Sequence, residues 1–540
     1  MEINIFKRLF GTESKSKTKE PKADFQGNGN YTNIMTLSYS GEKNLGEMGP
    51  AIDYRLDYGM LRLRSWQSQL ESDVCKTVIK RFVTWVVGEG LKLQSEPQID
   101  VLGMEGITIN KQDFSKIVEA RFGLFKKSKS ADYSEMSNID IIAANAFKNA
   151  IIGGDVLVIQ RFDGKNITVQ LIDGSHIQSP YIGDSYFATA TSNGNTILNG
   201  IEINPKGKHI AYYIRTYSPN GTFNKYERID ARSKSNGLQT AFLVYGSKHR
   251  LDNLRGLPLL AACLETAKKM ERYKEAVLGL AEEVAKTVYQ VTHQAYSDGS
   301  NPLGDRLAKA SGFENDKVEI PNDVLGQQIA NTVAATTNKQ AVNMPVGAEL
   351  KAVKNDTPIM FKDFYQVNTD LLCATVGIPP NVAMSKYDDS FSASRAAIKD
   401  WEHTLMVERR NFAFEFYEPI FQFWLDVEIL KNKINAPGYL DARNTGNTVV
   451  LDAYRKTRWV GSQVPHIDPV KEVKAEREKL GEAAKAIPLT TVERATEVLN
   501  GGESDSNIEQ FAIELAKCKE LGIEIEEKGV EVNEVDKVED

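Results

Sequence analysis

The stretch LLAACLETAKKMERYKEAVLGLAEEVAK (259–286) decides the fold, because one apolar stripe runs along its whole length. The stripe recurs at steps of three and four residues, through Leu260, Leu264, Ala267, Met270, Tyr273, Val277, Leu280 and Val284. This spacing predicts a single helix on the order of 40 Å long. A rod of this length exceeds what an ordinary globular domain needs.

The rod is followed by an insert and a second helix. Residues 287–357 lose apolar periodicity and are rich in Gly, Asn, Pro and Thr, which predicts a small separate subdomain whose ends return to the rod. A second helix is predicted near 359–376, with an apolar face formed by Phe361, Phe364, Val367, Leu371 and Ala374. The segment VGIPPNVAMSKYDDS (376–390) is predicted to end it as a loop, because two prolines cannot continue a helix.

Another long helix is predicted to begin at Ser392 or Ser394, either of which can cap it. Pro419 lies inside its apolar pattern and should kink it, since proline removes a backbone donor and clashes with the preceding turn. Its aromatic side chains, including Trp401 and Phe416, are interpreted as packing residues rather than as a base-stacking surface.

The amino-terminal half reads as α+β. Helices are predicted around 74–86, 112–127 and 138–151. The run VLVIQRF, the turn Asp163-Gly164 and the run ITVQLI predict a β-hairpin, and IEINPKGKHIAYYIR (201–215) predicts a second one. Short helices are expected within 469–520, followed by an acidic tail.

Length and charge limit the classes of function. At about 150 residues per domain, 540 residues suggest three or four structural units. The net charge of −7 lies largely in the last twenty residues, so the rest of the chain is nearly neutral. A neutral body argues against tight binding of nucleic acid through many phosphates. No apolar run approaches the roughly 20 residues of a membrane span, and the opening MEINIFKRLFG is interpreted as an arm or docking segment.

No catalytic, cofactor or metal site is expected. The sequence has no P-loop, HExxH, GxSxG or GxGxxG context, and its four cysteines are far apart, without a CxxC pair. The best enzyme candidate is a nuclease-like set of Asp468, Glu472 and Lys474. On a helix, Glu472 and Lys474 would point about 200° apart, so a solvated helical face is the preferred interpretation.

Seven segments, in this order, resemble the lambda-type family of tailed-phage portal proteins. They are TWVVGEGLKLQSEP (84–97), GGDVLVIQRF (153–162), NGIEINPKGKHIAYYIR (199–215), HRLDNLRGLPLL (249–260), SFSASRAAIKDWE (390–402), PHIDPVKEVKAE (465–476) and IPLTTVERATEVLNGGESD (487–505). The resemblance covers about residues 52 to 522 and is thin within 287–357.

The resemblance implies a portal fold assembled as a dodecameric ring at one capsid vertex. Its parts would be an amino-terminal arm (1–51), an α+β wing (52–257), two stem helices (258–286 and 358–377), a clip (287–357), a tunnel loop (378–391), a kinked wing helix (392–435), an α-helical crown (436–522) and a disordered acidic tail (523–540). Double-stranded DNA would be packaged and ejected through the ring, with no catalytic activity in the chain itself. The implied partners are the terminase large subunit, a head–tail adaptor and the major capsid or scaffold protein, in the host cytoplasm during assembly and then in the virion.

The resemblance also implies where DNA passes. The tunnel loop would face the channel with Ser385, Lys386, Tyr387, Asp388, Asp389 and Ser390, while Trp401, Phe416 and Pro419 would shape the kinked helix. Two other classes remain open at this point: another structural head protein, such as an adaptor or minor capsid protein, and a metal-dependent nuclease. The former would lack the order of rod, insert, rod, loop and kinked helix across 258–430.

Overall fold

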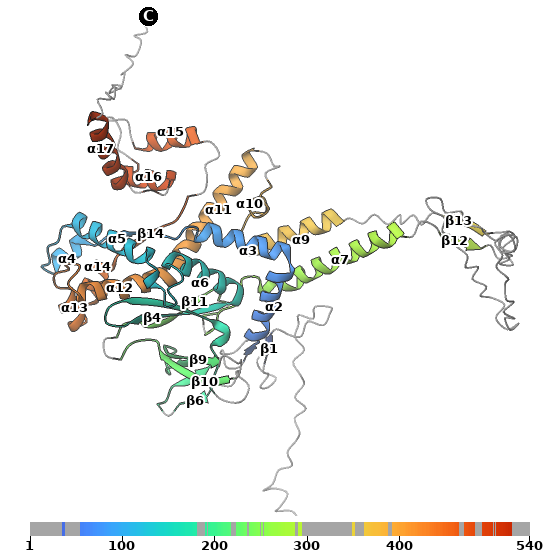
Figure 1. Ribbon diagram of the computed structural model, residues 1–540, viewed down its shortest axis with the longest axis horizontal. Helices are drawn as coiled ribbons and strands as arrows, with labels where there is room; N and C mark the ends of the chain where they lie inside the picture. Colours follow the sequence, from blue (N-terminus) through green and yellow to red (C-terminus); the bar gives the residue numbers. More distant parts are fainter. Residues whose placement is uncertain are drawn as a thin grey trace, which may run out of the picture. The chain divides into compact units, whose positions relative to one another are not determined.

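A computed structural model of the chain provides the structure (Figure 1). It describes residues 35–37, 54–180, 189–191, 193–217, 223–234, 237–248, 250–251, 253–286, 290–293, 348–351, 361–386, 391–463, 469–480, 489–500, 502 and 504–520. The predicted arm, except for 35–37, and the predicted acidic tail lie outside these ranges. The chain divides into two compact units, Met1–Ala267 with Thr369–Asp540, and Lys268–Asn368.

A three-stranded antiparallel sheet lies at the centre of the first unit. Its order is β11 (Ala241–Tyr245), β4 (Asp155–Phe162) and β5 (Ile167–Asp173), and helix α6 (Ile139–Gly153) packs on it (Figure 1). The backbone N–H groups of Lys165 and Asn166 donate to Oδ1 of Asp163 and close the turn between β4 and β5. The first predicted hairpin is therefore confirmed.

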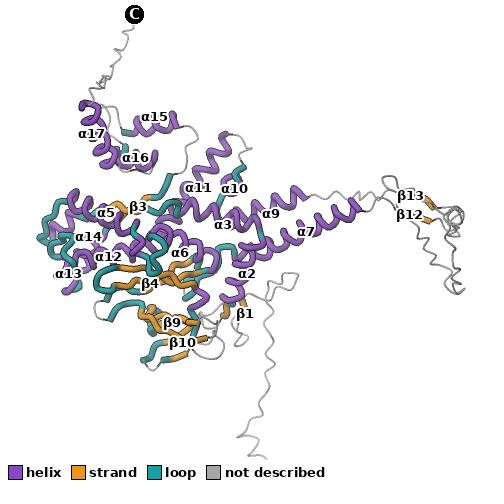
Figure 2. Tube along the Cα trace, in the orientation of Figure 1, coloured by secondary structure: helices purple, strands orange, loops and turns teal. Residues whose placement is uncertain are grey.

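A second antiparallel sheet has five strands, which run in the order β10-β9-β8-β7-β6. Their bounds are β6 Thr189–Ala190, β7 Thr196–Leu198, β8 Ile201–Ile203, β9 His209–Tyr217 and β10 Phe223–Asp230. The pairing of β8 with β9 confirms the second predicted hairpin. Sheets and helices share this part of the chain, as the α+β prediction requires (Figure 2).

Among the described residues, four α-helices precede α6 in the chain: α2 (Tyr58–Glu71), α3 (Asp73–Val86), α4 (Ile99–Met104) and α5 (Lys111–Lys127). Ser72 caps α3, because its hydroxyl accepts a hydrogen bond from the backbone N–H of Cys75. The strand β3 (Lys92–Ser95) pairs with β14 (Thr457–Val460), which comes more than 350 residues later. A short strand, β1 (Met35–Leu37), lies within the predicted arm and pairs with β2 (Tyr54–Leu56).

A large hydrophobic core joins the amino-terminal helices to the later part of the chain. It packs Phe114 and Phe122 of α5 against α12 (Glu418–Leu430), α13 (Tyr439–Thr445) and α14 (Thr448–Arg455). The ring centroids of Phe122 and Trp424 lie 5.1 Å apart in an edge-to-face arrangement. Residues distant in sequence therefore share one hydrophobic core.

The second unit contains most of the predicted rod. Helix α7 (Leu264–Lys286) follows a 3-10 turn at Ala261–Cys263, and α9 (Phe361–Val376) is the second predicted helix. Within this unit, Tyr273 contacts two aromatic rings of α9, with centroid distances of 5.9 Å to Phe361 and 4.4 Å to Phe364. The described ends of the insert, β12 (Gln290–His293) and β13 (Ala348–Lys351), pair antiparallel and so bring its two ends together.

Three helices end the described chain: α15 (Pro469–Lys479), α16 (Val492–Asn500) and α17 (Ser504–Glu520). Ion pairs connect them to earlier elements, including Lys116–Glu509 at 2.6 Å and Arg458–Glu493 at 3.4 Å. None of the helices in the described ranges is long and apolar enough to cross a bilayer.

Candidate functional site

The described part of the predicted tunnel loop begins as a helix. Pro379 precedes α10 (Pro380–Met384), and Pro380 occupies its first turn. Proline is well placed there because its missing N–H needs no partner and its fixed φ already suits a helix. The expectation of a continuous loop over 378–391 was therefore wrong for its first half.

The end of α10 presents two of the predicted channel residues. Ser385 adopts a left-handed conformation, with φ of 54°, and the backbone N–H of Lys386 donates to the carbonyl of Asn381 at 3.0 Å. The side chains of Ser385 and Lys386 are both exposed. The other four predicted residues, Tyr387, Asp388, Asp389 and Ser390, lie outside the described residues.

Helix α3 places further basic groups beside this segment. Helix α10 packs on α3, and the guanidinium of Arg81 donates to the hydroxyl of Ser385. Lys80 and Arg81 are exposed, as is Lys386. Sequence reasoning missed this contribution, although the pattern KTVIKRF carries the signal, because its basic residues fall between the apolar positions of an amphipathic helix.

The predicted kinked helix is interrupted by a wider turn. Helix α11 (Phe391–Phe412) and α12 are joined by a π-helical turn, Ala413–Tyr417, in which the backbone N–H of Glu418 donates to the carbonyl of Ala413. Pro419 lies two residues after the end of this turn and is half-buried. Proline cannot donate to the preceding turn, and π turns are one of the ordinary ways in which a helix accommodates such an interruption.

Trp401 on α11 and Phe416 within this turn are both buried, at 1% and 0% exposure. A chain of aromatic contacts links them to other elements: Trp401–Phe82 at 5.9 Å, Phe82–Phe147 at 5.7 Å, Phe147–Phe412 at 4.9 Å and Phe412–Phe416 at 5.4 Å between ring centroids. These rings come from α3, α6, α11 and the π turn. The contacts hold the long helix against the body of the first unit.

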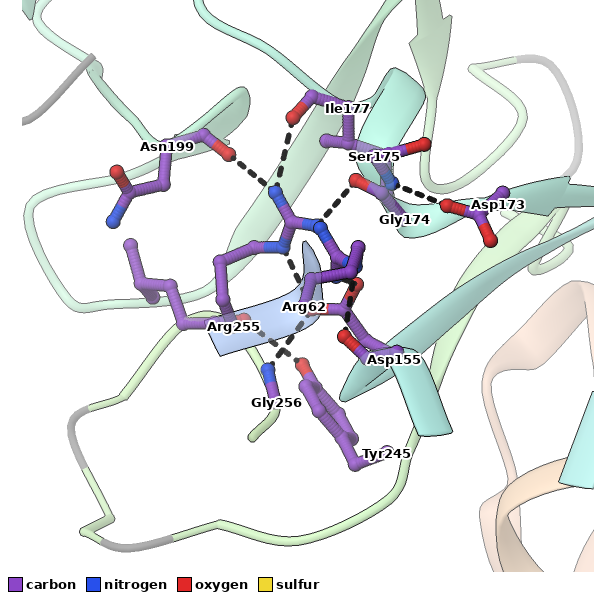
Figure 3. A network of polar contacts seen from close by, with 12 residues as sticks. Arg62, Asp155, Asp173, Gly174, Ser175, Ile177, Asn199, Tyr245, Arg255 and Gly256 are labelled. Carbon is purple, nitrogen blue, oxygen red and sulfur yellow. Dashed lines mark hydrogen bonds and ion pairs between the residues drawn. The ribbon is translucent and has the colours of Figure 1, made fainter. Parts of the chain in front are cut away.

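A buried carboxylate, Asp155, lies at the centre of a polar network (Figure 3). Its Oδ1 accepts hydrogen bonds from Arg62 and Arg255, each at 2.7 Å. Its Oδ2 accepts from Nε of Arg255 at 2.7 Å and from the backbone N–H of Gly256 at 2.9 Å. Arg255 also donates to backbone carbonyls, including that of Ile177 at 3.0 Å. The network therefore ties together α2, the first strand of the central sheet and the segment that leads into α7.

Two glycines permit the close packing of this network. A Cβ at Gly256 would lie 1.9 Å from the carbonyl oxygen of Gly154, and one at Gly174 would lie 1.9 Å from Oδ1 of Asp155. Neither position can therefore hold a side chain without displacing its neighbours. Gly154 is also a site of close backbone approach, because a Cβ there would lie 2.5 Å from the carbonyl oxygen of Gly256.

The charges in the network are coupled. Burial alone would raise the pKa of the Asp155 carboxyl, but Arg255 and Arg62 outweigh this effect and hold the pKa below its usual range. The side chains of Asp155, Arg62 and Arg255 are 0%, 8% and 4% exposed. Asp155 is thus an ionised anion shared by two cations, and a group of this kind stabilises a structure only while all its members are present.

The nuclease-like residues are not brought together among the described residues. Asp468 lies outside the described ranges, and Glu472 on α15 forms an ion pair with Arg395 of α11 at 3.9 Å. Within the described ranges, no group of three or more His, Cys, Asp or Glu side chains could hold a metal ion.

Comparisons with known proteins identify the family. The model of the lambda family of phage portal proteins matches residues 42–409. A probable portal protein of Halomonas phage phiHAP-1 is 22% identical over 502 residues, which cover 91% of this chain and 86% of the relative.

Solved structures of gene transfer agent (GTA) particles are also similar. A chain from the neck of the native particle, with C12 symmetry, has a TM-score of 0.35 and 10% identity and covers 77% of this chain and 97% of its own. One from the neck of the empty particle, with C6 symmetry, has a TM-score of 0.41 and 11% identity and covers 82% and 94%. At these scores the two structures correspond only loosely to this one. The family match, by contrast, spans well over half of the sequence, and the chain therefore belongs to the lambda family of phage portal proteins.

Proposed function

We propose that this chain assembles as a dodecameric ring at one vertex of a phage capsid, where it forms the head–tail connector. Double-stranded DNA enters the capsid through the central channel during packaging and leaves through it during ejection. The observation that carries the proposal is the family match over residues 42–409. Membership in a portal family also makes the chain a component of the virion.

Exposed apolar side chains on the stem support a ring. In the second unit, Leu278 is 57% exposed, and Phe364 and Val367 of α9 are 38% and 57% exposed. Apolar groups that recur along one helix face usually mark a contact surface. A ring covers such a surface on every copy, because rotation places an identical neighbour beside each stem.

Electron microscopy of the purified protein tests the assembly directly. We expect end-on views of a closed ring with a central hole. A population of monomers or open filaments, at concentrations where portal rings form, would contradict the proposal. A ring without a central opening would favour the alternative of another structural head protein.

The remaining parts receive roles from the family. The clip, 287–357, is the docking surface for the terminase large subunit and then for a head–tail adaptor, while the wing contacts the major capsid or scaffold protein. The stem is formed by 258–286 and 358–377, and the crown by 436–522. Energy for DNA movement comes from a separate motor ATPase, because the chain provides a channel rather than a catalyst.

The segment 378–391 is the part of the channel wall that touches DNA. Lys386, with Lys80 and Arg81 of α3 beside it, gives phosphate groups brief attractive contacts without holding the duplex still. The acidic residues Asp388 and Asp389 of the same segment limit the strength of these contacts.

Changing Lys386 should therefore affect packaging but not assembly. We expect Lys386→Ala rings to form normally and to package DNA less completely, and Lys386→Glu rings to package still less, because a carboxylate repels phosphates. Nuclease-protected DNA per capsid is the measurement, and Lys433→Ala, which removes another exposed lysine, is the matched control. A density map that places 378–391 on the outer surface of the ring would overturn this role.

A further inference from the structure

Helix α2 turns its apolar side chains toward solvent. The outward residues recur at steps of three and four and are Met60, Leu63, Trp66 and Leu70. Met60, Leu63 and Leu70 are 37%, 57% and 84% exposed, and Trp66 is half-buried. The buried positions of the same helix include the polar residues Arg62, Ser65 and Gln69. A surface helix normally has the opposite orientation, so this face is suited to a partner.

A groove runs beside this face. It has a volume of about 790 Å³, and its lining includes Tyr58, Leu63 and Trp66 of α2 together with residues 173 and 175–178. Arg62 and Arg255 of the buried network also line it, so the network of Figure 3 forms part of its wall. We call this site the α2 groove.

The amino-terminal segment enters the structure at the α2 groove. Strand β1 pairs with β2 so that Met35 lies opposite Leu56, immediately before α2 begins at Tyr58. Asp57 and Tyr58, at that junction, also line the groove. Residues 11–34 span up to roughly 80 Å when extended. The first ten residues can therefore reach this groove, on their own copy or on a neighbour.

The chemistry of the first ten residues matches the groove. The sequence MEINIFKRLF contains apolar residues that the groove can bury: Ile3, Ile5, Phe6, Leu9 and Phe10. Leu63 and Trp66 offer apolar contacts to them. Lys7 and Arg8 have opposite charges available in Asp57 and Asp173, two carboxylates of the groove lining.

We propose that residues 1–10 dock in the α2 groove, with their apolar side chains on the outward face of α2 and their cations near the two carboxylates. The segment covers the inverted face of α2 and reinforces the buried network behind it. This docking is separate from the formation of the channel. The proposal holds both for an arm from the same copy and for an arm from an adjacent copy.

A photoreactive residue in α2 identifies the occupant. Leu63 of the full-length chain is replaced by p-benzoylphenylalanine, the purified protein is irradiated, and the crosslinked peptides are identified by mass spectrometry. We expect the main crosslink to fall within residues 1–10. Mixing isotopically labelled with unlabelled copies then shows whether the arm belongs to the same chain. Crosslinks to another region of the chain, or no crosslink, would overturn the proposal.

Two further variants make the test specific. The combined changes Ile5→Glu and Phe6→Glu should reduce the Leu63 crosslink by about tenfold or more, because the docked segment loses two buried apolar side chains. The same photoreactive residue at Leu124, a 75% exposed leucine of α5, should not crosslink to residues 1–10. The crosslink between position 63 and residues 1–10 can be measured whether or not the protein forms a ring. Failure of the arm to dock can therefore be distinguished from failure of the chain to assemble. An equal crosslink yield in the Glu variant would also overturn the proposal.

Discussion

The change Asp155→Asn should lower the free energy of unfolding by about 3–5 kcal/mol, because it leaves two buried guanidinium groups without their shared anion. Asparagine has nearly the same shape as aspartate, so the loss reports charge rather than volume. Arg62 and Arg255 each donate to Oδ1 of Asp155 at 2.7 Å, and both are almost fully buried. Urea unfolding, followed by circular dichroism at pH 7, is the measurement.

A partly exposed ion pair provides the control. Asp230 pairs with Arg228, and the two side chains are 33% and 34% exposed. Solvent screens such a pair, so Asp230→Asn should leave the unfolding midpoint close to that of the wild-type protein. Equal stability of Asp155→Asn and the wild-type protein would show that the network contributes nothing to the fold.

Acid should remove the difference between Asp155→Asn and the wild type. The pKa of Asp155 in the folded protein lies below its usual range, so its stabilisation is fully present above the unfolded value of about 3.9. It is lost as the pH falls through the lowered folded pKa. The two unfolding curves should therefore converge at low pH, whereas a difference of constant size would indicate lost packing instead of lost charge.

The elements predicted from the sequence were those that short-range patterns determine. The strands on either side of Asp163 and the rod at 259–286 follow from alternation and from steps of three and four, which local backbone geometry sets. The network around Asp155 could not be predicted in this way. Its partners Arg62 and Arg255 are 93 and 100 residues away in sequence, and only the tertiary fold brings them together.

The structure differs from the sequence-based prediction at two proline sites, because a proline can be accommodated in more than one local conformation. The prolines at 379 and 380 indicated a loop, but a proline in the first turn of a helix is favourable, and α10 forms there. Pro419 indicated a kink, and the helix contains instead a π-helical turn that ends at Tyr417, directly before α12 begins at Glu418. Residue type indicated where the helical pattern changes but not which conformation replaces it.

The outward-facing apolar side of α2 shows another feature that a sequence pattern does not determine. Its apolar pattern at steps of three and four predicts which residues share a face but not which direction that face points. The buried partners of Arg62 set the orientation, because a guanidinium that donates to Gly153 and Asp155 must lie inward. The apolar residues then face outward and become available to a partner.

Truncating the aromatic side chains that pack around the long helix should lower the stability of the protein as much as the loss of the Asp155 charge does. Trp401→Ala and Phe416→Ala each remove a ring that is almost fully buried, and such changes typically cost about 3–5 kcal/mol. Phe416 contacts Phe412, and Trp401 contacts Phe82 of α3, so each change loosens the contact between the long helix and the body. We propose that the same packing sets the position of the helix against a neighbouring subunit.

Trp401→Phe separates ring packing from hydrogen bonding. Among the described residues, Nε1 of Trp401 has no hydrogen-bond partner, so phenylalanine breaks no hydrogen bond and keeps one aromatic ring at this position, although it loses the second ring of the indole. Trp401→Phe should therefore be far more stable than Trp401→Ala, as measured by thermal unfolding. Electron microscopy of the same samples should show fewer closed rings for both alanine variants. If both alanine variants formed normal portal rings with unchanged thermal stability, the side chains of Trp401 and Phe416 would not be what holds the long helix in place.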